Sequence, residues 1–194
     1  TNVGKALLTI LSRGVVRIGE EKTTEEMLDN LLVGDRDFLM IAIYKATFGN
    51  TAILQGLCPE DNTFKDVEIN INEDVKIKAI LDIYQRNFTV DCKVRTEEIS
   101  LPTGHTQKDL VNNADKSVAE LTTILLENCV NTINGSPVIG KAQVQNLGVN
   151  DRKKIASEIN SRNFGPIFDD IKVDCPDCDS EVFVPLNLGT LFRF

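Results

Sequence analysis

Two cysteines near the end of the chain, Cys175 and Cys178, have the type and spacing that metal binding needs. Two residues separate them, the first a proline, so the chain forms a turn that can direct both sulfurs at one ion. A redox pair is the competing interpretation. Such a pair sits at the N-terminus of a helix, whose dipole lowers the thiol pKa, whereas residues 182–188 alternate as a strand. The spacing therefore favours a metal site.

The chain contains a second version of this turn. Residues 58–63 align without gaps on residues 175–180, and the match continues into the segments that follow both. The second version begins with Cys58, but Asp61 stands where its other cysteine would be. We call the two turns knuckles, and we expect them to come together with three thiolates between them.

A structural zinc ion is the expected cofactor of the paired knuckles. Zinc takes four ligands in a tetrahedron, usually cysteine or histidine, and a carboxylate can also ligate it. The predicted metal ligands are Cys58, Asp61, Cys175 and Cys178. Two alternatives stay open at this point: His105, the only histidine, replaces Asp61, or the knuckles pack together without a metal.

The composition excludes several classes of protein. The chain has 194 residues and a formal net charge of −8, which argues against nucleic-acid binding because that depends on neutralising phosphates. There is no apolar run of 18 residues and no secretory signal pattern, so we expect no membrane insertion. Five cysteines, an odd number, indicate reduced thiols in a cytoplasm-like compartment.

Catalytic motifs are missing from the sequence. No nucleophile motif accompanies His105, and no glycine-rich phosphate loop is present. The prediction is that the protein is not an enzyme and has no catalytic residues. A zinc-ribbon module that binds nucleic acid is also disfavoured, since residues 169–181 carry six acidic residues and one lysine.

The elements that must position the knuckles are strands. Alternating apolar residues predict strands at 52–57 and 64–71 around the first knuckle, and at 171–173 and 182–188 around the second. Further strands are predicted at residues 75–81, 88–94 and 97–101.

Helical spacing of apolar residues occupies most of the remaining chain. Gly34 is expected to end the second helix, Asp35 to cap the third, and Gly49 to end the third. The predicted helices are residues 1–13, 25–33, 36–48, 106–113, 115–133, 140–147 and 150–161.

Together these elements predict an α+β fold. Two related strand–Cys-Pro knuckle–strand hairpins are brought together in it, with helices before, between and around them. We expect a single domain, residues 1–194. Its parts are a helical N-terminal part (1–50), the first knuckle and its strands (51–104), a helical insertion (105–162), and the second knuckle with an apolar C-terminal tail (163–194).

The last residues of the sequence are unusually apolar. Leu191, Phe192 and Phe194 need cover, because burying such a side chain contributes roughly 1.5–3 kcal/mol. We predict that these three residues bind a neighbouring protein, since aromatic anchors are common at the centre of interfaces. A tail folded over its own sheet is the alternative.

The order of segments resembles the baseplate hub-subunit family of T-even-type contractile phages, with relatives in phage-tail-like systems. The resemblance covers residues 31–194, from a leucine-rich helix to a Phe-rich end. Its motifs are Val-Gly-Asp-Arg-Asp-Phe (33–38), Ala-Thr-Phe-Gly (46–49), Leu-Pro-Thr-Gly (101–104) and the spaced knuckles. The family often carries Cys-Pro-x-Cys in both knuckles, so Asp61 is a departure that bears on the metal alone.

This resemblance implies a non-enzymatic structural or assembly protein of a phage tail baseplate or hub. Its partners would be other baseplate, hub or tail proteins, with no nucleic acid, and the role allows several copies per particle. The implied location is the virion tail, after synthesis in the host cytoplasm. An assembly factor absent from the finished virion and a zinc-ribbon adaptor module are the alternatives.

Overall fold

The structure, a computed structural model, describes residues 3–80, 82–93 and 96–193. Its helices are α1 (Val3–Gly14), α2 (Glu25–Asn30), α3 (Val33–Phe48), α4 (Ile71–Asp74), α5 (Gly104–Asn112), α6 (Val118–Cys129), α7 (Lys141–Gln145), α8 (Val149–Arg162) and α9 (Leu188–Phe192). Its strands are β1 (Arg17–Ile18), β2 (Glu21–Lys22), β3 (Thr51–Leu57), β4 (Phe64–Asn70), β5 (Ile77–Lys78), β6 (Asn87–Asp91), β7 (Thr96–Ser100), β8 (Val130–Ile133), β9 (Ser136–Pro137), β10 (Gly165–Pro166), β11 (Ile171–Asp174) and β12 (Glu181–Val184). The predicted α+β class is confirmed.

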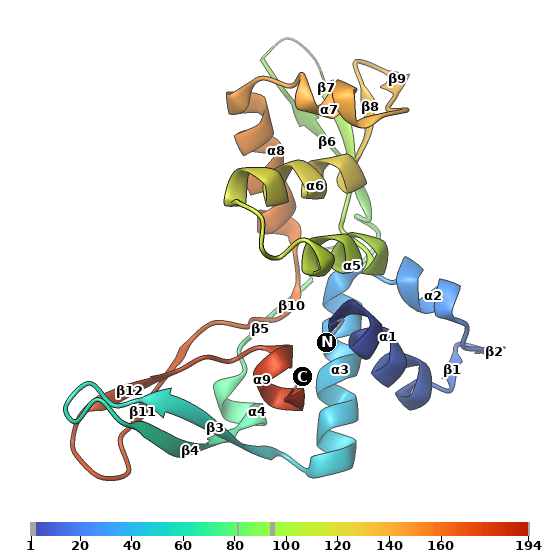
Figure 1. Cartoon of the computed structure of the whole chain (residues 1–194). Coiled ribbons are helices and arrows are strands. Elements are labelled where there is room, and N and C mark those ends of the chain that lie inside the picture. The colour runs from blue at the N-terminus through green and yellow to red at the C-terminus, as the bar shows by residue number, and fades with distance from the viewer. Residues whose placement is uncertain (1–2, 81, 94–95, 194) are drawn as a thin grey trace.

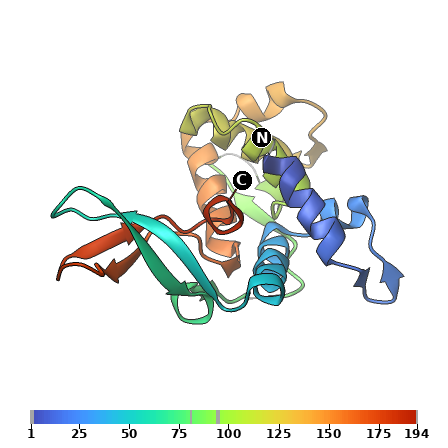
Figure 2. The same ribbon diagram turned by 60° about the horizontal axis from the view of Figure 1, so that its bottom comes forward.

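Two hairpins from distant parts of the chain form one antiparallel sheet. The strand order is β11-β12-β3-β4, and the hairpins meet where Phe183 pairs with Leu57. We call these four strands and the knuckles at their ends the arm. The arm projects away from the remainder of the molecule, at the lower left of Figure 1 and again at the left of Figure 2.

At the opposite end of the molecule lies a second four-stranded sheet, with the order β6-β7-β8-β9. Helices α6, α7 and α8 accompany it (Figure 1), and their buried residues share one core cluster with β6, β7 and β8. We call this unit the head.

Helix α3 stands between the arm and the short helices α1 and α2 (Figures 1 and 2). One side of α3 shares a core with the arm through Ile41 and Tyr44. Its Met40 packs in another cluster with Leu7, Leu11 and Leu28 of α1 and α2. The core therefore consists of one cluster behind the arm, one in the head and one among the first three helices.

Two of the motifs that carry the family resemblance, residues 33–38 and 101–104, meet in space. The amide of Val33 donates to the carbonyl of Pro102 (3.0 Å), and that of Gly104 donates to the carbonyl of Leu31 (3.1 Å). Arg36 is buried, and its guanidinium donates to the carbonyl of Leu28 (2.5 Å) and to Gln107 Oε1 of α5 (2.9 Å). These hydrogen bonds connect the start of α3 to α2 and α5.

The start of α3 differs from the sequence prediction. Gly34 lies inside the first turn of α3, so it does not end the previous helix, and the residue that caps α3 is Leu32 rather than Asp35. The cause is tertiary, because backbone hydrogen bonds with residues 102 and 104 hold the chain at the α2–α3 junction. The predicted end of α3 at Gly49 is confirmed.

The long helix predicted for residues 115–133 is shorter than expected. It ends at Cys129, and Val130–Ile133 continues as β8, paired with β7. Three of these four residues are β-branched, a side-chain type that favours strands. The strand predicted at 75–81 is reduced to Ile77–Lys78, which pairs with β10; residues 81 and 94 of the predicted strands lie outside the described ranges.

Candidate metal centre

The two knuckles have the same backbone hydrogen bond at aligned positions. The amide of Cys58 donates to the carbonyl of Thr63 (2.9 Å), and the amide of Cys175 donates to the carbonyl of Ser180 (2.9 Å). Each bond closes a six-residue turn that begins with a cysteine. The aligned residues of the sequence therefore adopt equivalent turns at the ends of β3 and β11.

Close packing of β3 on β12 brings the two turns together. A Cβ atom at Gly56 would lie 2.3 Å from Val182 Cγ1 and 2.9 Å from the Phe183 carbonyl oxygen. Any larger residue would push the strands apart, because such distances are well below ordinary contact. Gly56 therefore permits the approach that places Cys58 beside the second knuckle.

The sulfurs of Cys58, Cys175 and Cys178 form one cluster. Cys58 Sγ lies 3.6 Å from Cys178 Sγ and 3.8 Å from Cys175 Sγ, and all three sulfurs lie within 4.8 Å of one another. Sulfurs bound to one zinc ion lie about 3.8 Å apart, given Zn–S bonds of about 2.3 Å and tetrahedral angles. The spacing of the three thiols fits a shared metal ion.

Ser180 lies against two of these sulfurs and was not identified from the sequence. Its Oγ is 3.0 Å from Cys178 Sγ and 3.5 Å from Cys58 Sγ. The Ser180 hydroxyl is the main cause that lowers the pKa of Cys58 to about 7. A thiol with a lowered pKa provides the thiolate that a metal needs as its ligand.

The pKa of Cys175 is shifted in the other direction. The backbone amide of Asp177 lowers it, but burial and the neighbouring thiols of Cys178 and Cys58 outweigh that effect, so the pKa is raised. Three close thiols cannot all ionise without a compensating positive charge. A bound cation would supply that charge.

Asp61 does not lie among the sulfurs. Its carboxylate accepts hydrogen bonds from the Thr63 amide (3.0 Å) and hydroxyl (2.8 Å), and it pairs with Lys65 Nζ at 2.7 Å. The hydrogen bonds from Lys65 and Thr63 hold the pKa of Asp61 well below its usual range. The structure thus brings together three of the four predicted ligands, and it commits the fourth to other partners.

Lys65 is a further residue that the sequence did not identify. Its Nζ lies 2.7 Å from Asp61 in the first knuckle and 2.6 Å from Asp177 in the second. This cation bridges the two knuckles beside the thiols. Because Lys65 follows Asp61 by four residues, the sequence could have indicated the ion pair between them. It could not have indicated the ion pair with Asp177, which comes from the other hairpin.

The other candidate side chains lie elsewhere. His105 is exposed in the first turn of α5 and is not part of the thiol cluster. Cys129 is buried in the head, where burial raises the pKa of its thiol to about 12. Its predicted role as a small core residue is confirmed.

Two of the three residues predicted to bind a neighbouring protein lie against other parts of this chain. Leu191 is buried in this chain's own core cluster, and the ring of Phe192 packs edge-on against Tyr44, with 5.5 Å between centroids. These contacts arise because residues 188–192 form α9, which returns the chain to α3. Phe194, the third predicted anchor, lies outside the described residues.

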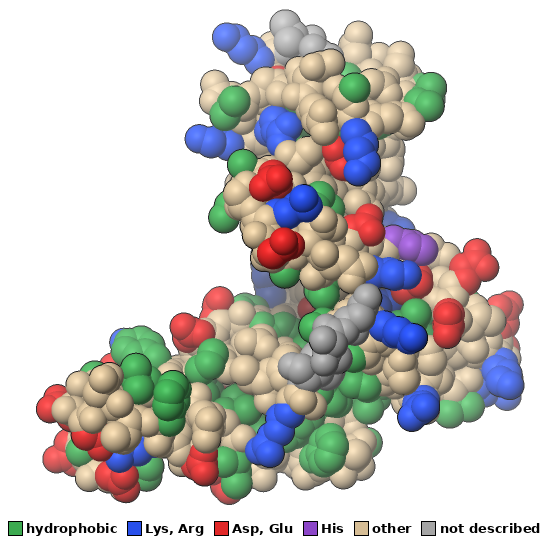
Figure 3. Space-filling view, viewed as in Figure 1, with side chains coloured by type: hydrophobic (Ala, Val, Ile, Leu, Met, Phe, Trp, Pro, Cys, Tyr) green, Lys and Arg blue, Asp and Glu red, His purple; other side chains and the backbone are tan. Residues whose placement is uncertain are grey.

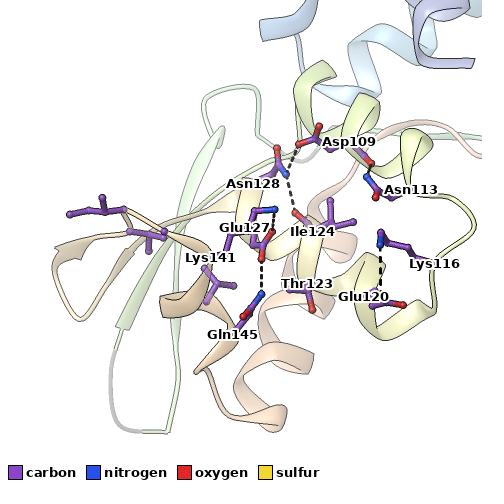
Figure 4. Close-up of a pocket in the computed structure, with 14 residues that line it drawn as sticks. Asp109, Asn113, Lys116, Glu120, Thr123, Ile124, Glu127, Asn128, Lys141 and Gln145 are labelled. Atoms are coloured by element: carbon purple, nitrogen blue, oxygen red, sulfur yellow. Dashed lines mark hydrogen bonds and ion pairs between the residues drawn. The ribbon is translucent and has the colours of Figure 1, made fainter. Parts of the chain in front are cut away.

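A groove of about 820 Å³ lies in the head between α5, α6 and α7. Its ionisable groups are paired, as the dashed lines in Figure 4 show: Glu127 with Lys141 (3.4 Å), Glu120 with Lys116 (3.9 Å), and Asp109 with the amide of Asn128 (3.2 Å). These pairs leave the groove without a converging set of acid, base and nucleophile among the residues that line it.

The fold and the thiol cluster define an α+β protein with a projecting arm whose knuckles share one candidate metal centre. A family model described as "T4 bacteriophage base plate protein" matches residues 2–102. The match spans more than half of the 194 residues, so the chain belongs to this family of phage baseplate structural proteins. Neither the curated proteins nor the solved structures gave a match.

The matched range contains residues 33–38 at the start of α3, the first half of the 101–104 motif and the whole of the first hairpin. It ends before the second knuckle. Within the described part of the chain, no helix is long and apolar enough to cross a membrane.

Proposed function

We propose that this protein is a non-enzymatic structural component of a phage tail baseplate or of its hub. It acts through contacts with other baseplate, hub or tail proteins in the virion tail, after synthesis in the host cytoplasm. The observation that carries this proposal is the family match over residues 2–102.

We further propose that Cys58, Cys175 and Cys178 bind one structural zinc ion. The support is the spacing of their sulfurs and the Ser180 hydroxyl, which can donate a hydrogen bond to a thiolate. Asp61 would not be among the ligands, because Lys65 and Thr63 hold its carboxylate. Zinc here would fasten two hairpins whose cysteines are 117 residues apart in the chain, and would thereby stabilise the arm.

The experiment is genetic. In a phage whose gene for this chain is disrupted, a tagged copy is supplied, and baseplates and finished virions are purified separately. We expect incomplete baseplates without the protein, and the tagged chain in both particles when it is supplied. Normal baseplates and infectious virions in its absence would overturn the proposal.

An assembly factor that leaves before the virion is finished is the second candidate. It would give a different pattern in the same experiment: the tagged chain would be found in baseplate intermediates but not in virions.

A further inference from the structure

The arm has an inner face and an outer face. Residues alternate between them along β3 and β4, so that one set packs in the core behind the arm and the other set faces solvent. On the outer face, a row of directly paired residues crosses all four strands: Lys172, Phe183, Leu57 and Phe64. Cross-strand pairing places these side chains next to one another.

This row exposes large apolar groups. Phe64 is 70% exposed, Phe183 52% and Leu57 43%, and these three are direct neighbours. Ile53, on the same face of β3 but separated from Leu57 by Gln55, is 54% exposed. We call these four residues the arm face. The solvent-facing side of an antiparallel sheet normally carries polar side chains, and a contiguous exposed apolar patch marks an interaction site.

Acidic residues border the arm face on both sides. Asp66 and Glu68 of β4 lie on one side, and the pair Asp174–Glu181 of β11 and β12 lies on the other. Along the outward positions of these described strands, the one positively charged residue is Lys172, which lies 3.2 Å from Glu181 and 5.2 Å from the centroid of the Phe183 ring. Outside these strands, Arg193 lies at the same edge of β3, with its guanidinium 3.4 Å from the carbonyl oxygen of Ile53. Four acidic residues therefore stand against two basic ones. Figure 3 shows apolar and acidic side chains together at the outer end of the arm.

The apolar centre and acidic border of the arm face indicate which kind of partner surface it can bind. An apolar centre favours a partner that buries its own apolar side chains, and an acidic border favours Lys and Arg around them. A second copy of this chain would bring the same acidic border against itself. Nucleic acid and anionic lipid surfaces would be repelled for the same reason.

We propose that the arm face docks onto another baseplate protein that presents apolar side chains surrounded by Lys or Arg. This inference rests on the proposed baseplate role. It adds that Ile53, Leu57, Phe64 and Phe183 form the surface through which the protein binds its partner. The thiol cluster lies at the ends of the same strands, so a metal there would fix the two hairpins in the register that aligns the row.

The first test measures entry into baseplates made by a phage that lacks this chain. Phe64→Ser and Phe183→Ser are compared with wild type and with two controls, Tyr84→Ser and Ile139→Ser, whose side chains are 87% and 92% exposed outside the arm. We expect the two arm variants to enter about tenfold less, the effect of losing a central interface residue. The controls should enter like wild type, and all four variants should keep the wild-type melting temperature.

The outcomes separate this inference from the proposed function. If wild type does not enter baseplates, the proposed function fails. If wild type and both arm variants enter equally, the function stands and the docking of the arm face is overturned.

A second test addresses the charge of the partner. The double variant Asp66→Lys/Glu68→Lys is compared with Glu20→Lys/Glu21→Lys, which changes the same number of charges in the exposed β1–β2 turn region. We expect the Asp66→Lys/Glu68→Lys variant to fail to enter baseplates and the Glu20→Lys/Glu21→Lys variant to enter like wild type. A photoreactive phenylalanine analogue at position 64 should cross-link, in the baseplate, to a Lys- or Arg-bearing segment of a different protein. A cross-link to another copy of this chain, or to an acidic segment, would overturn the proposed chemistry.

Discussion

At the scale of single residues, the candidate metal centre differs from its prediction at Asp61. Its carboxylate is committed to Thr63 and Lys65, while Ser180 Oγ approaches two of the sulfurs. The sequence alone was sufficient to predict that the three thiols of Cys58, Cys175 and Cys178 come together. The reason is the ungapped repeat, which places an equivalent turn at the end of each hairpin. It did not predict the neighbours of Asp61, because Lys65 is positioned partly by Asp177 from the other hairpin.

The metal prediction follows from this arrangement. Protein purified without chelator should contain one zinc per chain, and Cys58→Ser or Cys178→Ser should lower the content well below one because each removes a thiolate. Asp61→Asn should keep its zinc, since this side chain is not among the ligands. The measurement is zinc per chain by elemental analysis, and Cys92→Ser serves as the cysteine control. Loss of zinc from Asp61→Asn would restore Asp61 to the ligand set.

Asp37 provides a second residue-level test. Burial raises the pKa of its carboxyl to about 7, although hydrogen bonding to Gln107 and the charge of Arg36 oppose the shift. The folded state therefore favours the protonated form. The stability that Asp37 contributes is fully present below the pKa of the unfolded chain, near 4, and is lost as pH rises through about 7.

Asp37→Asn should remove this pH dependence. At pH 8 the variant should be more stable than wild type, on the order of 2 kcal/mol after allowance for partial solvent screening, and near pH 4 the two should be equal. The amide oxygen can still accept the hydrogen bond from Gln107. Urea unfolding at both pH values gives the comparison, with the exposed Asp169→Asn as control. A variant that is less stable at pH 8 would refute the account.

At the scale of elements, the close approach of α3 to the segment before β10 depends on Gly34. A Cβ atom there would lie 2.4 Å from the carbonyl oxygen of Phe164 and 2.8 Å from its ring. Gly34→Ala should therefore destabilise the protein by about 1–3 kcal/mol, the usual cost of overpacking. This loss would occur despite the better helix propensity of alanine.

The control for Gly34→Ala is Ser157→Ala on the exposed side of α8, which changes helix propensity without adding a contact. It should be neutral or slightly stabilising in thermal or urea unfolding. If Gly34→Ala proved equally neutral, α3 and residue 164 would not lie as close as described.

Sequence patterns correctly predicted the elements whose ends depend on residues nearby in the sequence. The hairpins around the knuckles alternate in polarity, and both hairpins are present in the structure. The failures lie where tertiary contacts determine the outcome. Val130–Ile133 forms a strand instead of continuing α6, because it pairs with β7. The start of α3 is determined by hydrogen bonds with residues 102 and 104 rather than by a capping side chain.

At the scale of the whole molecule, the arm and the head lie at opposite ends, with α3 and its neighbouring helices between them (Figure 1). The repeat in the sequence predicted a meeting of two distant segments, but no pattern in it indicated an exposed apolar row. That row appears when the register joins Phe183 to Leu57 and Leu57 to Phe64. The arrangement leaves the arm accessible to a partner.

The most direct test of the central claim is a cryo-electron microscopy structure of the intact baseplate. It should contain this chain as an ordered subunit, with Phe64 and Phe183 buried against a basic and apolar surface of a neighbouring protein. Density for one metal ion should lie between Cys58, Cys175 and Cys178. A finished baseplate without this chain, or one in which the arm face remains in solvent, would contradict the account.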